Sequence, residues 1–277
     1  MNHVFYHSKC YDGFGAAYAA WKKFGDKAEY HAVSYGYPPP GVKGETLYIV
    51  DFSYPMDVLN NLHESFENNN FKKRFEKIVI IDHHKTAQES LEENKDAYPW
   101  LEIYFDMEKS GALMTWEYFH PKIPAPMLIR WISDRDLWQF KLPDSEKVHK
   151  ALVSFPMDFK LWDKFAKGEY DLSTEGITCE RLYSQLVDQI TKSHWLKMID
   201  GRKVPVVNTS IAWSEVGAKL LELNPKTPFA ASFTVFDDQV MWSLRSRSNE
   251  DVDVSAIAKK FGGGGHKHAA GFKAQRF

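Results

Sequence analysis

Acidic residues and histidines stand at the ends of several short apolar runs in this chain. The clearest case is Asp82-His83-His84, which directly follows residues 78–81, an unbroken run of Ile and Val. Three such groups after a buried strand would be costly to bury without polar partners. Carboxylates and imidazoles together suit Mn, Fe or Zn ions, and carboxylate-rich sets favour Mn²⁺ or Mg²⁺. The other candidate ligands are His7, Asp12, Asp51, Asp134 and Asp136.

The elements that must position these residues alternate between strand and helix patterns. β-rich apolar runs occupy residues 4–6, 47–50, 78–81 and 101–105, and helical patterns cover about 13–24, 56–68, 111–119 and 126–132. Ser110 stands where an N-cap would precede the third of these helices. The alternation predicts an α/β fold, with a parallel sheet and helices on both faces. Since ligands of open parallel sheets bind beyond the carboxyl ends of the strands, the acidic residues and histidines should converge there.

Such a cluster is suited to phosphoester chemistry. Two divalent ions about 3.5–4 Å apart can bridge a phosphate and activate a water between them. Asp51, at the end of a strand, is well placed to bridge the ions. Taken singly, an Asp after a strand is commonly a helix cap or turn residue, and a lone His is commonly a surface or core residue. The combination of groups, rather than any one of them, favours a metal centre.

The second half of the chain predicts a connecting helix and a smaller domain. Residues 178–199 have the pattern of an amphipathic helix. Residues 204–207, 229–236 and 240–244 read as strands, and the last two flank a hairpin turn at 237–239. We therefore divide the chain into a metal-binding domain (1–175), a connecting helix (176–200) and a smaller α/β substrate-binding domain (201–277).

Arginines, glycines and a histidine near the C-terminus could hold an anionic ligand. Arg245 and Arg247 alternate on a predicted strand, so both would lie on one face, where two guanidinium groups can grip a phosphate. The glycines at 262–265 lack Cβ atoms, so their backbone could approach a ligand and present N–H groups. A solvated strand edge and a linker or helix C-cap are the respective alternatives. The predicted substrate-binding set is Arg245, Arg247, Gly263, Gly264, Gly265 and His266.

Composition restricts the partners and the compartment. The net charge is -2 over 277 residues, and the pI is about 6.6, so no general basic field is present to hold long duplex nucleic acid. A short anionic substrate in a local cationic pocket fits better. Cys10 and Cys179 are the only cysteines, which favours a reducing compartment. The first residues lack a secretory-signal pattern and no run is long enough to span a membrane, so we expect a cytoplasmic protein.

The acidic motifs resemble those of a known superfamily. Asp82-His83-His84 after its Ile-rich run, with Asp12-Gly13, Asp51 and Asp134, is similar to the motifs of the DHH phosphoesterases. Residues 242–272, including Gly-Gly-Gly-Gly-His, resemble the DHH-associated C-terminal substrate domain. The resemblance covers nearly the whole chain, with residues 141–200 matching only as a connector. Its glycine-rich ending points to nucleotide substrates, and its layout is similar to that of the nanoRNase-like members.

The resemblance implies roles for individual residues. His7, Asp12, Asp51, His83 and Asp134 would ligate two Mn²⁺ ions, with Asp51 as the bridge. Mg²⁺ or another divalent ion is the alternative, and Asp134 is preferred over Asp136. Asp82 would orient or ligate at the same centre, and His84 would contact the scissile phosphate. Arg245, Arg247 and His266 would hold the far end of the substrate.

One departure from the family pattern concerns the first motif. The superfamily usually has two acidic residues there, whereas this chain has Lys9 and Cys10 before Asp12. One metal site would then be weaker, or completed by water or another side chain. Lys9 would alternatively contact phosphate.

The resemblance implies hydrolysis of short RNA or DNA oligonucleotides, or of linear dinucleotides, to nucleoside monophosphates. An aromatic residue such as Trp138 or Phe272 could stack on a base. One alternative is a phosphatase acting on a 3′,5′-bisphosphate nucleotide or on pyrophosphate. The other is a nucleotide-binding module that has lost catalysis through the departure at Lys9.

Overall fold

A computed structural model of the chain describes residues 1–67, 70–94, 96–236, 238–249 and 251–275. Its contacts divide the chain into two compact units, Met1–Glu180 and Arg181–Phe277. Helix α8 (Leu172–Thr191) contains the point at which the first unit ends and the second begins. Among the described helices, none combines the length and the apolar character needed to cross a membrane.

The first unit is organised around a five-stranded sheet. Its strands are β1 (Asn2–His7), β2 (Ala28–Val33), β3 (Gly44–Val50), β6 (Phe75–Asp82) and β7 (Leu101–Phe105), in the order β2-β1-β3-β6-β7. Every neighbouring pair is parallel. The chain moves from β1 to β2 in one direction and continues from β3 on the other side of β1. The order therefore reverses between β1 and β3. In open parallel sheets, ligands bind beyond the carboxyl ends of the strands at such a reversal.

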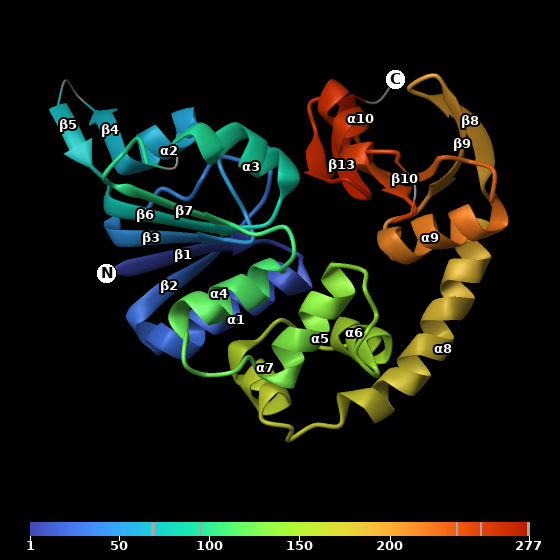
Figure 1. Ribbon diagram of the computed structural model, residues 1–277, viewed down its shortest axis with the longest axis horizontal. Helices are drawn as coiled ribbons and strands as arrows, with labels where there is room; N and C mark the ends of the chain where they lie inside the picture. Colours follow the sequence, from blue (N-terminus) through green and yellow to red (C-terminus); the bar gives the residue numbers. More distant parts are fainter. Residues whose placement is uncertain (68–69, 95, 237, 250, 276–277) are drawn as a thin grey trace. The chain divides into compact units, whose positions relative to one another are not determined.

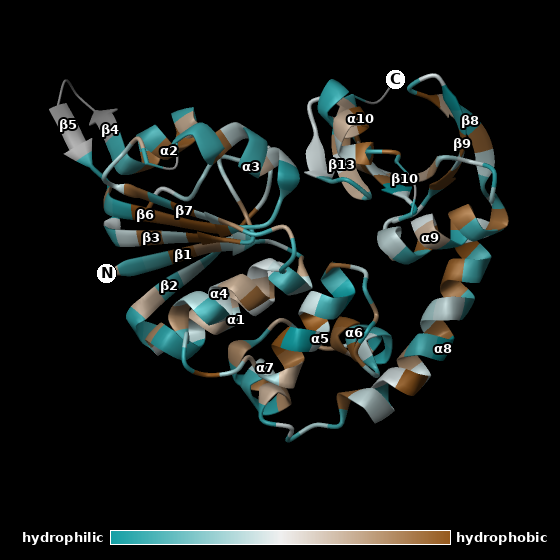
Figure 2. Cartoon of the chain, in the orientation of Figure 1, coloured by the Kyte–Doolittle hydropathy of each residue, from teal (hydrophilic) through white to brown (hydrophobic). Residues whose placement is uncertain are grey.

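Helices cover both faces of this sheet, which confirms the predicted α/β fold. Helices α2 (Met56–His63) and α3 (Lys85–Leu91) lie on one face, and α1 (Tyr11–Phe24) and α4 (Gly111–Phe119) lie on the other (Figure 1). Successive strand residues pack into separate hydrophobic cores on the two faces of the sheet. Phe5 belongs to one core and Val4 to the other. The interior strands are accordingly most hydrophobic in their inner parts, as at residues 78–81 of β6, whereas polar residues such as Glu45 and Glu76 lie nearer their starts (Figure 2). Ser110 caps α4 by accepting a hydrogen bond from the Leu113 amide at 3.3 Å, as its position predicted.

Strand β2 was not predicted from the sequence. It reads Ala-Glu-Tyr-His-Ala-Val and lies at the edge of the sheet. It needs no continuous apolar run, because only its first and last residues, Ala28 and Val33, are buried. The helix expected at 56–68 ends earlier, at His63, and is followed by a hairpin of β4 (Glu64–Glu67) and β5 (Asn70–Lys73). Residue 68 itself lies outside the described residues.

Three further helices complete the first unit: α5 (Met127–Asp136), α6 (Ser145–Val153) and α7 (Phe159–Ala166). Short 3₁₀ turns occupy Gly25–Lys27 and Glu92–Asn94. An aromatic core joins α1 to these helices through Phe14, Tyr18 and Trp162. Helix α5 runs to Asp136, past the expected end near 132, and this extension changes the candidate site.

The second unit is a six-stranded mixed sheet. Its strands are β8 (Trp195–Ile199), β9 (Arg202–Asn208), β10 (Phe229–Phe236), β11 (Gln239–Ser246), β12 (Gly264–His266) and β13 (Ala269–Gln275), in the order β12-β13-β11-β10-β9-β8. Only β9 and β10 pair in parallel among these described strands. Helix α9 (Trp213–Leu223) and helix α10 (Val254–Lys260) contribute to two separate cores. The helix expected to reach 199 ends at Thr191, and the remaining residues form β8. Residue 237 of the expected hairpin turn lies outside the described residues.

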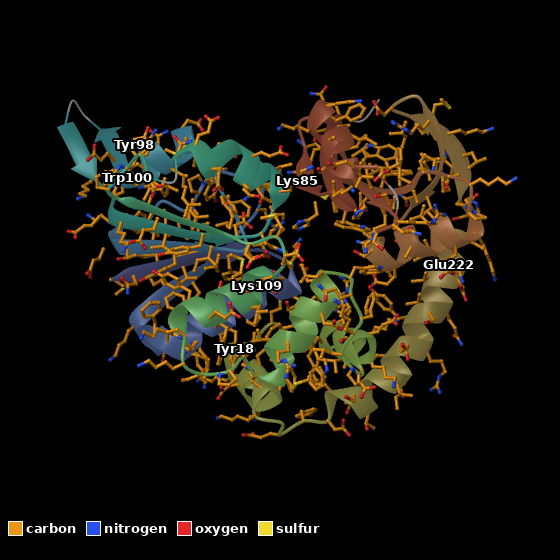
Figure 3. The ribbon with its side chains drawn as sticks, in the orientation of Figure 1. Tyr18, Lys85, Tyr98, Trp100, Lys109 and Glu222 are labelled. Atoms are coloured by element: carbon orange, nitrogen blue, oxygen red, sulfur yellow. The ribbon has the colours of Figure 1, made fainter. Side chains whose placement is uncertain are left out.

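Asp163 of α7 ties that helix to α1. Its carboxylate accepts hydrogen bonds from the Tyr18 hydroxyl at 3.0 Å and the Lys22 ammonium at 2.7 Å, and it pairs with Lys167 at 2.7 Å (Figure 3 labels Tyr18). Burial alone would raise the pKa of Asp163, but the bonds from Lys167, Lys22 and Tyr18 outweigh it and lower the pKa to about 2. A carboxyl whose pKa is depressed in the folded state adds stability above its unfolded pKa, and this is lost as pH falls through the folded pKa.

We therefore expect Asp163→Asn to lower the free energy of unfolding by about 1 kcal/mol at pH 7, a value reduced for the exposure of the lysines. The difference from wild type should shrink as the pH is lowered below about 4. Urea unfolding at a series of pH values measures it. An equal difference at pH 7 and pH 3 would contradict the assignment.

Candidate metal centre

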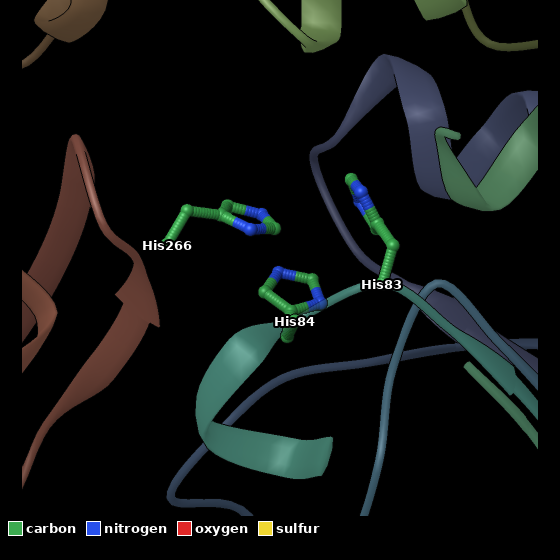
Figure 4. Close-up of side chains that lie close together, drawn as sticks. All are labelled: His83, His84 and His266. Atoms are coloured by element: carbon green, nitrogen blue, oxygen red, sulfur yellow. The ribbon is translucent and has the colours of Figure 1, made fainter. Parts of the chain in front are cut away.

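Five segments bring acidic residues and histidines together at the carboxyl edge of the parallel sheet. His7 ends β1, Asp51 follows β3, and Asp82 ends β6. His83 and His84 lie on the segment that joins β6 to α3 (Figure 4). Asp12 lies in the first turn of α1, and Asp136 ends α5. Of the residues predicted to converge, His7, Asp12, Asp51, His83 and His84 are therefore found together in the first unit.

Asp51 occupies the middle of the cluster. Its Oδ1 lies 3.2 Å from His83 Nε2, and its Oδ2 lies 3.6 Å from His7 Nδ1. Within the described part of the chain, neither oxygen has a partner in good hydrogen-bond geometry, although Asp51 is only 1% exposed. Burial alone would raise the pKa of Asp51, but the imidazoles of His7 and His83 lower it well below its usual value. One carboxylate thus presents one oxygen to each side of the cluster.

The backbone at Asp51 has an uncommon conformation and lies close to the start of α4. Asp51 has a positive φ of 52°, an uncommon conformation for a non-glycine residue, and its amide donates to the Ile81 carbonyl at 2.9 Å. A Cβ on Gly111 would lie 2.5 Å from the Asp51 Cβ. Glycine at 111 therefore lets the start of α4 reach the end of β3.

Asp12 is held at the N-terminus of α4. Its carboxylate accepts hydrogen bonds from the amides of Gly111 at 2.6 Å and Ala112 at 3.0 Å. Its Oδ2 also lies 3.4 Å from His83 Nε2. Burial, followed by the charges of Asp51 and Asp136, raises the pKa of Asp12 well above its usual value. Asp12 therefore also caps a helix, α4, as the alternative reading allowed. The hydrogen bonds from Gly111 and Ala112 hold its carboxylate beside His83.

His83 faces three carboxylates through one nitrogen. Besides the contacts with Asp51 and Asp12, its Nε2 lies 3.5 Å from Asp136 Oδ2. Burial would lower the pKa of His83, but Asp51, Asp136 and Asp12 raise it to about 10. A metal ion bound at this nitrogen would have to displace its proton, as is general for histidine ligands.

Asp82 orients His84 rather than facing the open cluster. It is fully buried and accepts hydrogen bonds from Ser53 Oγ at 2.6 Å, the His83 amide at 2.8 Å and His84 Nδ1 at 2.7 Å. One ring nitrogen of His84 lies within 4.8 Å of ligand atoms of His7 and Asp51. Ser53 was not predicted, although its position two residues after Asp51 was the available signal.

Asp136, and not Asp134, lies with Asp12 and His83. The expectation that Asp134 is the ligand assumed that both residues follow a helix that has already ended. Because α5 continues through both, they point about 200° apart around its axis. The Asp134 carboxylate instead accepts bonds from the amides of Lys141 at 2.9 Å and Leu142 at 3.1 Å, and from the Ser145 hydroxyl. Asp134 fastens the turn between α5 and α6, so the prediction is corrected to Asp136.

The donor set fits divalent metal ions. Two groups of side chains each bring their ligand atoms within 4.8 Å of one another: His7, Asp51 and His84 form one, and Asp12, His83 and Asp136 form the other. The buried oxygens of Asp51, which accept no well-formed hydrogen bond from any described residue, are the observation that supports a bridging position. Mixed carboxylate and imidazole donors of this kind suit Mn²⁺ and related ions.

In the unusual first motif, Lys9 and Cys10 lie before helix α1, whereas Asp12 lies in its first turn. Lys9 is exposed and has a φ of 54°. Cys10 precedes α1, and burial together with Asp51, Asp136 and Asp12 raises the pKa of its thiol well above the usual value. Burial and the surrounding carboxylates therefore favour the protonated thiol at this position.

Tyr35 is a site residue that sequence reasoning missed. Its ring centroid lies 5.6 Å from His7, 6.1 Å from His84 and 4.2 Å from Phe52, on which it stacks. The side chain is nevertheless 44% exposed. It follows β2, the strand that was not predicted, so no pattern pointed to it.

In the second unit, the glycine run has two structural roles. The amides of Gly262 and Gly263 donate to the carbonyls of Lys259 and Ala258 and close the end of α10. Gly264 and Gly265 belong to β12 and pair with Gly271 and Ala270 of β13. A Cβ on Gly263 would lie 2.1 Å from the Gly271 carbonyl oxygen. The predicted free loop is therefore corrected to a helix cap and a short edge strand, with the C-cap alternative partly right.

The prediction that Arg247 binds the substrate is also corrected. It lies beyond the end of β11, and its guanidinium donates to the carbonyls of Thr227 at 2.8 Å and Leu221 at 2.7 Å. These bonds close the C-terminal end of α9. Arg245 stays on β11 and packs over Gly217 of α9, where a Cβ would lie 2.8 Å from the arginine Cβ. His266 ends the edge strand β12 (Figure 4). Phe272, suggested for base stacking, is 7% exposed and packs in the core.

Comparisons with known proteins agree with this architecture. Residues 206–276 match the DHHA1 domain family. The uncharacterised protein R106 of Acanthamoeba polyphaga mimivirus is 31% identical over 294 residues, which cover 97% of this chain and 66% of that protein. Oligoribonuclease NrnB of Bacillus subtilis is 23% identical over 309 residues, covering 98% of this chain and 72% of NrnB. The chain thus spans roughly two thirds of R106 and somewhat more of NrnB.

A solved structure shares the fold. The DHH domain of PF0399, described as a member of the s1p family of ribosomal proteins, superposes with a TM-score of 0.59 at 11% identity. The alignment covers 99% of this chain and 82% of that one.

The two aspartates of α5 provide a direct test of the corrected site. We expect Asp136→Asn to weaken Mn²⁺ binding by at least about tenfold, because it removes a ligand that faces His83, while the melting temperature changes little. Asp134→Asn should do the reverse and lower the free energy of unfolding by about 2 kcal/mol, because it weakens buried hydrogen bonds to a charged group. Calorimetric Mn²⁺ titration and thermal melting of both variants measure this. Weaker Mn²⁺ binding in Asp134→Asn, with unchanged binding in Asp136→Asn, would show that Asp134 is the ligand.

Proposed function

Because this chain belongs to the DHH phosphoesterase superfamily, we propose that it is a divalent-metal-dependent phosphodiesterase that cleaves short oligonucleotides or linear dinucleotides to nucleoside monophosphates. The observation that carries the proposal is that buried Asp51 directs one carboxylate oxygen to each side of the cluster. Its Oδ1 lies near His83 and its Oδ2 near His7. This arrangement suits a carboxylate that bridges two ions and supports the family-level chemistry.

His7, Asp12, Asp51, His83 and Asp136 are the residues that would hold the ions, and Mn²⁺ is the ion we propose for both positions. Bound divalent ions would lower the pKa of an attacking water and offset charge on the phosphoryl oxygens. The chain's own contribution is to fix these groups on strand ends and on the first turn of a helix, where their orientation is set before substrate arrives.

His84 is the group that we assign to the phosphate. Its Nδ1 bonds to Asp82 at 2.7 Å, which fixes the orientation of the ring. Burial would lower the pKa of His84, but Asp82 raises it overall, which favours the imidazolium form. A protonated imidazole can donate a hydrogen bond to the oxygen on which charge develops during attack at phosphorus.

In the second unit, Arg245 and His266 are the residues that we propose for contacts with the substrate, whereas the bonds of Arg247 to backbone carbonyls give it a supporting role. Tyr35 is the aromatic side chain that we propose for base stacking, because its exposed ring lies beside His7 and His84. The name of the relative NrnB, an oligoribonuclease, supports short RNA as the substrate class.

The reaction itself is the first test. With Mn²⁺, the protein should release nucleoside monophosphates from a labelled RNA dinucleotide, and Asp51→Asn and His84→Ala should each lower kcat by at least about a hundredfold. Asp188→Asn, a change of an exposed residue that pairs with Lys219, is the matched control and should retain activity. Failure to cleave RNA or DNA dimers to pentamers with any divalent ion would reject the proposal. Turnover of pyrophosphate or a 3′,5′-bisphosphate nucleotide alone would replace it by a phosphatase.

Tyr35 provides a second test. Base stacking on an aromatic side chain contributes about 1–3 kcal/mol, so we expect Tyr35→Ala to raise KM for the dinucleotide by about 5- to 150-fold. Tyr35→Phe keeps the ring and should behave like the wild type. Equal effects of both substitutions would show that the hydroxyl, and not the stacked ring, is what matters.

A further inference from the structure

A second group of metal-ligating side chains lies at the opposite edge of the parallel sheet. His3 is near the start of β1, and Glu29 and His31 are in the first half of β2. His3 is in register with Glu29, and His31 is two residues further along the same strand. Because strand side chains alternate, the register alone places all three side chains on one face. They lie about 13 Å along β1 from His7, four residues away at strand rise.

The ligand atoms of the three side chains face one another. His3 Nδ1 lies 3.1 Å from His31 Nε2. The Glu29 carboxylate oxygen Oε2 lies 3.5 Å from His3 Nδ1 and 3.6 Å from His31 Nε2. In a tetrahedral site with Zn–N distances of about 2.0–2.1 Å, ligand atoms are separated by about 3.3 Å. The observed triangle is therefore close to one face of a zinc tetrahedron.

The orientation of His3 is fixed by the backbone. Its Nε2 lies 3.1 Å from the Lys43 carbonyl oxygen, which can only accept a hydrogen bond, so Nε2 carries the proton. In the neutral imidazole, Nδ1 then has its lone pair directed at His31 and Glu29. A metal-binding histidine typically donates its other N–H to a carbonyl or carboxylate in this way.

Packing holds the same ring in place. A Cβ on Gly44, at the start of β3, would lie 2.7 Å from His3 Cδ2. His3 also stacks on His31, with ring centroids 5.4 Å apart, and contacts the edge of Phe75 at 5.6 Å. The His3 side chain is 4% exposed, whereas Glu29 is 52% exposed. Two imidazoles are thus supported from within the protein, and the carboxylate closes the site from the solvent side.

We propose that His3, Glu29 and His31 form a binding site for Zn²⁺ or a similar borderline transition metal, distinct from the centre at the carboxyl edge. Two imidazoles and one carboxylate supply three ligands, and water on the side of Glu29 supplies the fourth. The paired imidazoles favour Zn²⁺, Ni²⁺ or Cu²⁺ over Mg²⁺, which prefers oxygen ligands. The ligands of the ion lie on β1 and on the edge strand β2, so the ion would hold these two strands together and stabilise the sheet. His3 also contacts the Lys43 carbonyl just before β3.

The test compares zinc content between full-length variants that share an unaltered catalytic centre. After equilibration with Zn²⁺ and removal of free metal, elemental analysis should find one zinc per chain fewer in His31→Gln than in wild type. His194→Gln is the matched control, because that histidine bonds the Thr191 carbonyl in the second unit. It should keep the wild-type zinc content. Equal zinc content in wild type and His31→Gln would overturn the proposal.

A second variant guards against loss of zinc through misfolding. Glu29→Gln alters an exposed side chain and should leave the melting temperature of the zinc-free protein unchanged. It should weaken zinc binding at this site by at least about tenfold, the loss typical of removing even an outer partner of a metal site. Added Zn²⁺ should raise the melting temperature of the wild type more than that of Glu29→Gln, because a ligand that binds only the folded state stabilises it. Identical zinc-dependent shifts in the two proteins would reject the site.

Mn²⁺-dependent dinucleotide cleavage separates this inference from the proposed function. Glu29→Gln and His31→Gln should both retain that activity. If cleavage fails in the wild type while the zinc difference remains, only the proposed function is lost.

Discussion

The structure of the first unit depends on how it accommodates buried carboxylates at one edge of a parallel sheet. Asp12, Asp51 and Asp82 are 2%, 1% and 0% exposed. Placing three such groups close together is unfavourable, both because each loses its hydration and because their charges repel. Surrounding imidazoles and amides offset this only in part, and a divalent cation would complete the compensation.

Each carboxylate is compensated by a different part of the fold. Asp82 is satisfied by Ser53, His84 and the amide of His83. Asp12 is satisfied by the first amides of α4, which Gly111 allows to approach. Asp51 receives only the longer contacts from His7 and His83 among the described residues. The fold thus fixes two carboxylates with its own donors and leaves the central one directed at the space between two histidines. This difference in satisfaction, more than the number of acidic residues, distinguishes a metal centre from a crowded capping site.

Much of this arrangement could be predicted because strand ends are visible in the sequence. A buried parallel strand is a short apolar run, so the residues that follow it are known to within one or two positions, and His7, Asp51 and His83 were placed in this way. Helix ends are less certain. A few extra residues of α5 turned Asp134 away and brought Asp136 in. Strand β2 is buried only at its two ends and lacks a continuous apolar run, so it was missed, and Tyr35 with it. In the second unit, residue types that commonly bind phosphate were recognised, but Arg247 and the first glycines turned out to close helix ends. An arginine side chain or a glycine amide can hydrogen-bond to the protein's own backbone as well as to a ligand. The sequence does not show which of the two partners lies nearer in the folded chain.

The two edges of the parallel sheet have different physical tasks. At the carboxyl edge the strands lead into helices and turns that carry polar side chains, and the reversal between β1 and β3 leaves room for a ligand. At the amino edge no such crevice is required, and a cluster there acts on the pairing of the strands themselves. His3 and His7 lie on the same face of β1, so one strand contributes an imidazole to each cluster. The intervening Phe5 is fully buried and keeps the two polar clusters apart within the core. A metal at His3 would therefore act on the stability of β2, and the buried Phe5 stands between it and His7 on this face of β1.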